Sequence, residues 1–255
     1  MKKPIMTVIG FGRMGRRFAE IFAEEFDVRV SSTRDEVREE INQLGARFAT
    51  DRKHSISASD YVFLAAPVSA FPALVEELNS HAREDVVVMD CASARTRAER
   101  ELSGLKHRHF GIHDIRGGEF CITGDMDERM KRFFEDRKIA LRPVSPEEHD
   151  RLNAVIGVGH FVGLVLAEIL SDEEKEMLAG VRSGSWLVGL MKHLQANSYT
   201  TWRETQLDNP FTEEQRKRLI EAFQRYDGVL GAGTFPFDKN EKRGTGVRPS
   251  DPGDR

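Results

Sequence analysis

A glycine-rich turn near the amino terminus, in the stretch VIGFGRMGRR, constrains the fold more than any other feature of the sequence. Gly10, Gly12 and Gly15 stand in G-x-G-x-x-G spacing, directly after an apolar run and at the start of a helical pattern. The first glycine permits a tight turn, the second lets the backbone approach a pyrophosphate, and the third allows a helix to pack closely on a strand. The spacing therefore predicts the first strand–helix unit of a dinucleotide-binding domain. A glycine-rich turn without a ligand is the alternative.

Short apolar runs alternate with amphipathic segments through the first half of the chain. The runs predict strands at 5–10, 27–32, 61–66 and 85–90, with further short strands at 107–113, 120–123 and 138–144. Near-continuous apolar strands that alternate with helices are typical of a parallel sheet covered on both faces. We therefore predict an α/β fold with a Rossmann-type doubly wound parallel sheet.

The pattern changes at the stretch SPEEHD, which begins with Ser145. Serine, then proline, then glutamate three residues after the serine is a capping arrangement, and the apolar run behind it predicts a helix to about Leu170. Helical patterns continue beyond that helix. We predict three segments, namely the Rossmann domain, a mainly α-helical dimerisation domain and a disordered polar tail, at 1–145, 146–236 and 237–255.

Composition excludes several classes of protein. The formal charge of −4 over 255 residues offers no broad basic field, so we expect no nucleic acid partner. Two cysteines make neither a disulfide framework nor a zinc spacing, which fits a reducing cytoplasm and predicts no metal site. The amino terminus lacks the cleavage site of a signal peptide. Polar residues interrupt the apolar stretch 152–170, so a buried core helix explains it better than a membrane span.

The end of the second predicted strand, Val-Ser-Ser-Thr-Arg, indicates which dinucleotide binds. An NAD site carries Asp or Glu about 20 residues after the first glycine, whereas here no acid precedes Asp35. Hydroxyls followed by arginine suit a 2′-phosphate, so we predict NADP rather than NAD. A role in capping the next helix is the alternative, and it is compatible with phosphate binding. The expected cofactor contacts are Gly10, Phe11, Gly12, Arg13, Met14, Gly15, Ser31, Ser32, Thr33, Arg34, Ala66 and Pro67.

Several segments, taken in order, resemble the prephenate/arogenate dehydrogenase family of tyrosine biosynthesis. They are VIGFGRMG, DYVFLAAPVSAFPALVEEL, MDCASARTRAE, GIHDIRGG and SPEEHDRLNAVIGVGHFVGLVLAEIL, and the resemblance covers about residues 1–230. The Ser-Thr-Arg stretch and Lys192 most resemble the NADP-using arogenate enzymes. The resemblance implies an NADP-dependent oxidative decarboxylation of prephenate or arogenate to 4-hydroxyphenylpyruvate or tyrosine. Hydride leaves C4 of the cyclohexadiene, the ring carboxylate departs as CO2, and the ring becomes aromatic.

The resemblance also implies roles for individual residues. His113 matches the catalytic histidine, which accepts the proton of the C4 hydroxyl. Ser93 matches a serine that hydrogen-bonds the histidine and the substrate, although a helix N-cap explains a serine there equally well. Arg95 takes the family's basic position, and His160 matches a second histidine that lines the substrate site, with a satisfied core histidine as the alternative. Lys192 is the nearest cation to the expected carboxylate site.

The loop around the histidine departs from the family pattern. Asp114 and Arg116 stand where relatives carry proline and an aromatic residue. We expect the carboxylate of Asp114 to raise the pKa of His113. The stretch WLVGLMKHLQANSYTTW lacks the family's carboxylate-binding arginine, so we predict that Arg116 supplies that guanidinium. His149, in the same SPEEHD stretch, is expected on the surface of the first helical turn.

Three other functions stay open on sequence grounds. The substrate could be 4-amino-4-deoxyprephenate, with its amine near Asp114. A β-hydroxyacid or imine reductase is a second possibility, but it would need a lysine where this chain reads HDRLNAVIG. A non-catalytic NADP-binding homologue is the third. The long apolar helix needs more cover than one small helical domain offers, which predicts a homodimer through that domain.

Overall fold

The computed structural model describes residues 3–116 and 119–232, and the side chains of all of these except 115 and 116. The chain forms two compact units, of which the first ends at Gln215 and the second begins at Arg216. The predicted tail at 237–255 lies outside the described residues. The predicted domain boundary at 145/146 stays a prediction.

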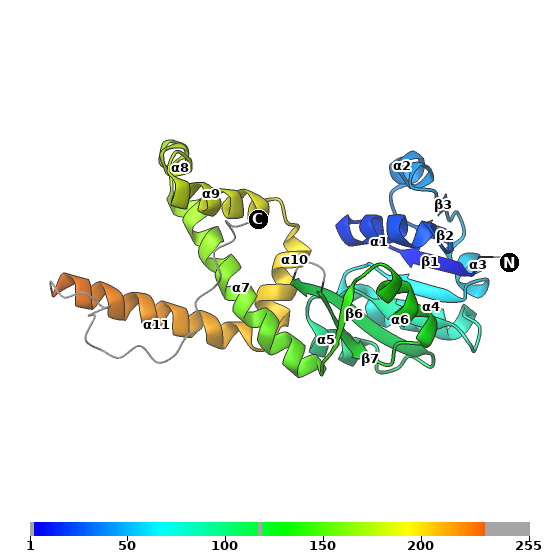
Figure 1. Cartoon of the computed structure of the whole chain (residues 1–255). Coiled ribbons are helices and arrows are strands. Elements are labelled where there is room, and N and C mark those ends of the chain that lie inside the picture. Colours follow the sequence, from blue (N-terminus) through cyan, green and yellow to red (C-terminus); the bar gives the residue numbers. More distant parts are fainter. Residues whose placement is uncertain (1–2, 117–118, 233–255) are drawn as a thin grey trace. The chain divides into compact units, whose positions relative to one another are not determined.

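Within the described residues, eight strands form one sheet in the order β3-β2-β1-β4-β5-β6-β7-β8 (Figure 1). The strands are β1 Ile5–Ile9, β2 Asp27–Ser31, β3 Arg47–Phe48, β4 Tyr61–Leu64, β5 Val87–Asp90, β6 Arg108–Arg116, β7 Glu119–Gly124 and β8 Ala140–Pro143. All neighbours pair in parallel except β6 and β7, which are antiparallel. Chain order reverses between β1 and β4, and open α/β sheets bind their ligands beyond the carboxyl ends of the strands at such a point.

Helices cover both faces of this sheet, as predicted. Phenylalanines of α1 and α6 form a core with β1, β2 and β4 on one face, and α4 and α5 close the other. The helices are α1 Arg13–Ala23, α2 Arg38–Gln43, α3 Arg52–Ser57, α4 Phe71–His81, α5 Arg95–Glu101, α6 Glu128–Asp136, α7 Pro146–Ile169, α8 Asp172–Ala179, α9 Arg182–Gln195, α10 Tyr199–Arg203 and α11 Thr212–Gly231, with a π-helical segment, η3, at Glu204–Asp208. Short 3-10 turns, η1 Asp35–Val37 and η2 Val68–Ala70, precede α2 and α4.

The predicted strands are confirmed to within a few residues, with two differences. β3 was not predicted, because two residues carry no readable alternation. β6 does not end at His113 but continues to Arg116. The antiparallel partner β7 provides hydrogen bonds for this extension, which has no partner on β5 beyond Gly111.

The predicted long helix is α7, and Ser145 caps it by accepting a hydrogen bond from the Glu148 amide at 3.1 Å. By length and composition α7 could cross a membrane, yet only 28% of its most apolar window is buried. Val155 and Ile169 are 63% and 65% exposed. The expectation that this helix is a buried core helix is therefore wrong for the single chain: buried residues such as Asn153, Gly157 and Gly163 alternate with exposed ones along its whole length.

Candidate functional site

A cavity of about 670 Å³ opens beyond the carboxyl ends of β1, β4 and β5, at the amino terminus of α1. Eleven of the twelve residues predicted to contact the cofactor line it, namely Gly10, Phe11, Gly12, Arg13, Met14, Ser31, Ser32, Thr33, Arg34, Ala66 and Pro67. The twelfth, Gly15, lies beneath the turn. Ser93 and His113 line the same cavity. The structure thus brings together the predicted cofactor turn and both predicted catalytic residues.

The three glycines differ in what surrounds them. Gly10 has φ +103°, and a Cβ there would lie 2.7 Å from the carbonyl oxygen of Ala65. A Cβ on Gly15 would lie 2.1 Å from the Gly10 oxygen, so this position lets α1 pack on β1. A Cβ on Gly12 would meet nothing within 4 Å. Gly12 is the N-cap of α1 and faces the cavity, so the helix offers free backbone N–H groups where a pyrophosphate fits.

Arg34 is held at the adenosine end expected for this cavity. Its guanidinium donates to the Phe11 carbonyl at 2.6 Å, and its amide donates to Ser32 Oγ at 3.1 Å. No side chain of this stretch caps the following turn, so the capping alternative is not what the structure shows. Asp35, the first acid after β2, has an 88% exposed side chain and lies 3.7 Å from Arg38. Arg52 of α3 adds a second guanidinium to the cavity wall.

His113 lies inside β6, just past the last residue that pairs with β5. Its Nδ1 is 2.9 Å from Nε2 of His149, and Nδ1 of His149 is 2.9 Å from Oδ1 of Asp150. His149 and Asp150, from the first turn of α7, are fully buried. The expectation of a surface His149 is wrong, because the first turn of α7 packs against α5 and carries the histidine toward β6.

Asp150 also binds the free backbone amides at the amino terminus of α5, the role that a helix-capping Ser93 would have had. It accepts hydrogen bonds from the Arg95 and Thr96 amides at 2.8 and 2.9 Å and from the Thr96 hydroxyl at 2.5 Å. The N-cap of α5 is Ala94, so Ser93 is not the cap. The Ser93 carbonyl accepts from Asn153 at 2.7 Å. Burial alone would raise the pKa of Asp150, but hydrogen bonds from His149, Thr96 and the backbone outweigh burial and lower it.

The electrostatic setting of His113 differs from the expectation. Burial, followed by the neighbouring His149 and Arg95, lowers the pKa of His113 to about 3, while Asp150 opposes the shift. Asp114 does not raise this pKa, because its carboxylate lies 3.3 Å from Arg17 instead. The imidazole of His113 is therefore neutral at pH 7, with one ring nitrogen unprotonated.

Arg95 has a different setting from the predicted one. Its side chain is fully buried and pairs with Asp90, and it contacts Glu99 Oε1 and Thr123 Oγ1 at 3.0 Å each. It does not line the cavity. The guanidinium ties β5, α5 and β7 together, so it is committed to the fold rather than open to a substrate carboxylate.

Two other predicted substrate residues, His160 and Lys192, do not line the cavity. His160 stacks edge-on against Trp202, with ring centroids 6.3 Å apart, and burial together with His193 lowers its pKa. Lys192 is exposed on α9. The side chain of Arg116 lies outside the described residues. Among the described side chains, the cations that line the cavity are Arg13, Arg34 and Arg52.

Glu204 is a cavity residue that the sequence did not reveal. Its carboxylate accepts a hydrogen bond from the Val68 amide at 3.2 Å and another from the backbone of Ser93. Burial, with a contribution from Asp208, raises the pKa of Glu204. The surrounding WRETQ stretch resembles any polar helical surface, so no sequence signal marks it. Asn197 similarly approaches the cofactor turn and accepts from Arg13 at 2.9 Å.

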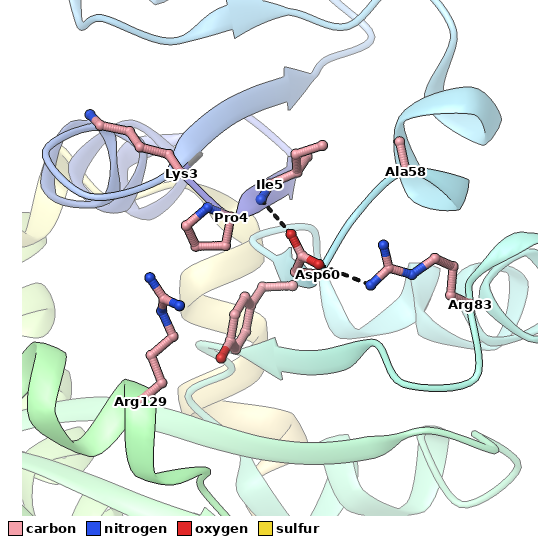
Figure 2. A pocket seen from close by; sticks show the side chains of 8 residues that line it. Lys3, Pro4, Ile5, Ala58, Asp60, Arg83 and Arg129 are labelled. Atoms are coloured by element: carbon pink, nitrogen blue, oxygen red, sulfur yellow. Dashed lines mark hydrogen bonds and ion pairs between the residues drawn. The ribbon is translucent and has the colours of Figure 1, made fainter. Parts of the chain in front are cut away.

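A second hollow, of about 660 Å³, lies near the amino ends of β1 and β4. Asp60 accepts hydrogen bonds there from the Ile5 amide at 2.7 Å and from Arg83 at 2.9 Å (Figure 2). Ile5 and Tyr61 begin β1 and β4, so this hollow adjoins the amino ends of the strands. Doubly wound sheets bind cofactors at the other edge, and this hollow is not the dinucleotide site.

Comparison with known proteins identifies the family. The family described as prephenate dehydrogenase, nucleotide-binding domain, matches residues 23–167, more than half of the chain. The chain belongs to the prephenate dehydrogenase family. No curated protein sequence matches it.

Solved structures agree with this family at the level of the fold. Prephenate dehydrogenase from Aquifex aeolicus, in complex with hydroxyphenyl propionate and NAD+, is 18% identical with a TM-score of 0.71, over 91% of this chain and 92% of that one. Arogenate dehydrogenase from Synechocystis is 18% identical with a TM-score of 0.53, over 91% and 90%. An imine reductase from Pseudomonas sp. is 15% identical with a TM-score of 0.53, over 91% and 79%. Prephenate dehydrogenases therefore share this architecture with other reductases, and the site must distinguish the reactions.

Proposed function

We propose that the chain is an NADP-dependent dehydrogenase that oxidatively decarboxylates prephenate or arogenate. One observation supports this most strongly: a neutral histidine lines the same cavity as the glycine turn and Arg34. The bound dinucleotide would supply the hydride acceptor. Gly12 and the amino terminus of α1 would hold its pyrophosphate, and Ser31, Ser32, Thr33 and Arg34 would hold a 2′-phosphate.

In the proposed reaction, His113 holds a proton during one turnover and then returns it. As hydride leaves C4, the O–H bond of the C4 hydroxyl breaks, its proton moves to His113, and a C4 carbonyl forms. The bond from C1 to the carboxylate then breaks. Its electron pair makes the ring aromatic and places charge on the C4 oxygen, which takes the proton back. His113 ends neutral, and the products are CO2, the reduced dinucleotide and the phenol.

The residues at the start of α7 favour this reaction over that of a β-hydroxyacid or imine reductase. That alternative needs a catalytic lysine at the start of the long helix, and α7 contains none. Its buried positions there are His149, Asp150 and Asn153. A polar, hydrogen-bonded histidine suits proton transfer from a hydroxyl.

The test is to mix purified protein with NADP and either prephenate or arogenate and to follow NADPH absorbance. We expect turnover in the wild type. In His113→Asn we expect kcat to fall by about 10²–10⁴, the usual contribution of a general base, with NADP affinity unchanged. A near-normal kcat in this variant would remove His113 from the mechanism. Absence of turnover with either substrate and either NADP or NAD would contradict the proposed function itself.

We also propose that the enzyme is a cytoplasmic homodimer. Exposed apolar side chains on α7 and α9 support the dimer, among them Val155, Val165, Ile169 and Trp186. Apolar surface of this extent is more often covered by a partner than left in water. A second copy of the same helical segment would cover it without any membrane.

A further inference from the structure

The two buried polar residues behind His113 have no assigned task in the reaction. His149 and Asp150 are each fully buried, and burying a histidine and a carboxylate is costly unless both are hydrogen-bonded. They continue in a line from His113, with 2.9 Å from His113 to His149 and 2.9 Å from His149 to Asp150. Only the outer member, His113, lines the cavity.

The hydrogen bonds determine where each proton lies. Asp150 accepts from two backbone amides and from the Thr96 hydroxyl, and these hydrogen bonds together with His149 lower its pKa despite its burial, so the carboxylate is ionised at neutral pH. Nδ1 of His149 must therefore carry the proton that it shares with Asp150, and its Nε2 is then an acceptor. Because His113 reaches that acceptor through Nδ1, His113 must also be protonated on Nδ1. This leaves its Nε2 as a bare lone pair.

We propose that His149 and Asp150 form a relay that fixes the tautomer of His113 and shares the charge that His113 acquires from the substrate. The inference rests on the proposed function, in which His113 accepts the hydroxyl proton. Both residues are positioning residues, since they act through His113 and line no part of the cavity.

The relay answers a difficulty in the chemistry. A buried imidazole resists protonation, and of the groups whose charges act on His113, namely His149, Arg95 and Asp150, only Asp150 favours a positive charge. When Nε2 of His113 takes the hydroxyl proton, the proton on its Nδ1 can move to Nε2 of His149. The positive charge then lies beside the Asp150 carboxylate. The same transfers run backward when the C4 oxygen recovers its proton, so no proton is gained or lost.

The first test needs no substrate. Histidine-labelled protein is studied by ¹⁵N NMR, with resonances assigned from the His113→Asn and His149→Gln variants. We expect both His113 and His149 to be protonated on Nδ1 and bare on Nε2. A proton on Nε2 of His113 in the wild type would overturn the relay.

The second test uses kinetics in three variants. His149→Phe removes both the acceptor and the charge carrier, and we expect kcat to fall by about 10²–10³, within the range of acid–base catalysis. His149→Gln keeps an acceptor but cannot carry charge, so its loss should be smaller. His81→Phe, the matched control, removes an exposed histidine of α4 that does not line the cavity, and its kcat should stay within about threefold, a change of less than about 0.7 kcal/mol. KM and NADP affinity should change little throughout.

A pH profile separates the relay from mere support of the fold. In the wild type we expect kcat to be level between neutral and mildly alkaline pH. In His149→Gln it should rise with pH, because the hydroxyl proton must then leave without the relay. A uniform loss at every pH, or a normal kcat in His149→Phe, would overturn the proposal. If His149→Phe does not fold, the NMR result and His149→Gln decide. If the wild type turns over neither substrate, the proposed function fails, while the tautomers still report on the relay.

Discussion

At the scale of single residues, the buried setting of His113 should control stability as well as chemistry. Its pKa is about 3 in the folded protein, against about 6.5 for an exposed histidine. Between about pH 3 and pH 6.5, this histidine therefore binds a proton in the unfolded chain but not in the folded one. This contribution to stability is fully present above about pH 6.5 and is lost as pH falls toward 3. Linkage predicts a loss of about 2 kcal/mol between pH 7.5 and pH 5.

Urea unfolding of the wild type and His113→Asn at both pH values checks this expectation. The variant should lose less stability on acidification than the wild type. The comparison is needed because His109 has the opposite sign: its bond to Glu99 raises its pKa, and its contribution is lost as pH rises. Equal losses in the two proteins would show that His113 is not neutral in the fold.

Arg34 is the residue that should decide between the two dinucleotides. A guanidinium paired with a phosphate contributes about 1.5–3 kcal/mol, so Arg34→Ala should raise KM for NADP by about tenfold or more. KM for NAD, which lacks the 2′-phosphate, should stay within about twofold. Arg38→Ala is the matched control, since Arg38 follows on the same segment but does not line the cavity. Steady-state kinetics with both cofactors measure this, and unchanged NADP affinity would reject the preference for NADP.

Residue roles were predictable from the sequence where a motif fixes them. The glycine turn, the end of β2, Ser93 and His113 all lie at the cavity, because spacing relative to strands also fixes position at the sheet edge. His149 and Glu204 were not predictable, because a buried polar residue leaves no apolar periodicity. Arg95 was predicted to contact the substrate, but its side chain points into the fold. The sequence placed the residue near the site correctly and could not show the direction of its side chain.

At the scale of elements, the turn between β1 and α1 uses different glycines for helix packing and for phosphate binding. Gly15→Ala places a Cβ against a backbone oxygen, so it should lower the melting temperature strongly. Gly12→Ala meets open space, so it should change stability by less than about 1 kcal/mol, as expected of an N-cap substitution. It should nevertheless raise the cofactor KM at least tenfold, roughly 1.4 kcal/mol or more, since the methyl group occupies the space of the phosphate.

Thermal unfolding and cofactor binding, measured on both variants, check this pair. The expected pattern is a stable Gly12→Ala protein that binds the dinucleotide weakly and an unstable Gly15→Ala protein. A Gly12→Ala variant with normal affinity would mean that the phosphates do not approach this turn.

The strands were predictable because parallel strands buried on both faces are continuous apolar runs. The residues at which the strands begin and end were less predictable. β6 extends past its predicted end because β7 returns beside it, a pairing that depends on residues elsewhere in the chain. The caps of α7 and α8 are local signals: Ser145 caps α7 as predicted, and Ser171 caps α8 in a capping box with Glu174.

At the scale of the whole molecule, we predict a dimer in solution. Val165 and Ile169 are four residues apart on α7, so they share one face, and they are 40% and 65% exposed. Light scattering should give twice the mass of the chain for the wild type. The double variant Val165→Asp, Ile169→Asp should give a monomer. Ser103→Asp, which adds the same carboxylate at an exposed position beside α5, should remain dimeric. A monomeric wild type would contradict the prediction.

Sharing of Asp150 between His149 and the first turn of α5 limits how relatives can be recombined. A chimera joined at residue 145 would bring a foreign helix whose first turn must both accept from the amides at the start of α5 and hydrogen-bond His113 on β6. Two parents that each work well need not give a working hybrid there. A junction placed after Gly157 would instead keep the Asp150 carboxylate with Arg95, Thr96 and His149, its own partners. The sequence pattern thus changes between the sheet and the helical segment, but the two cannot be exchanged independently.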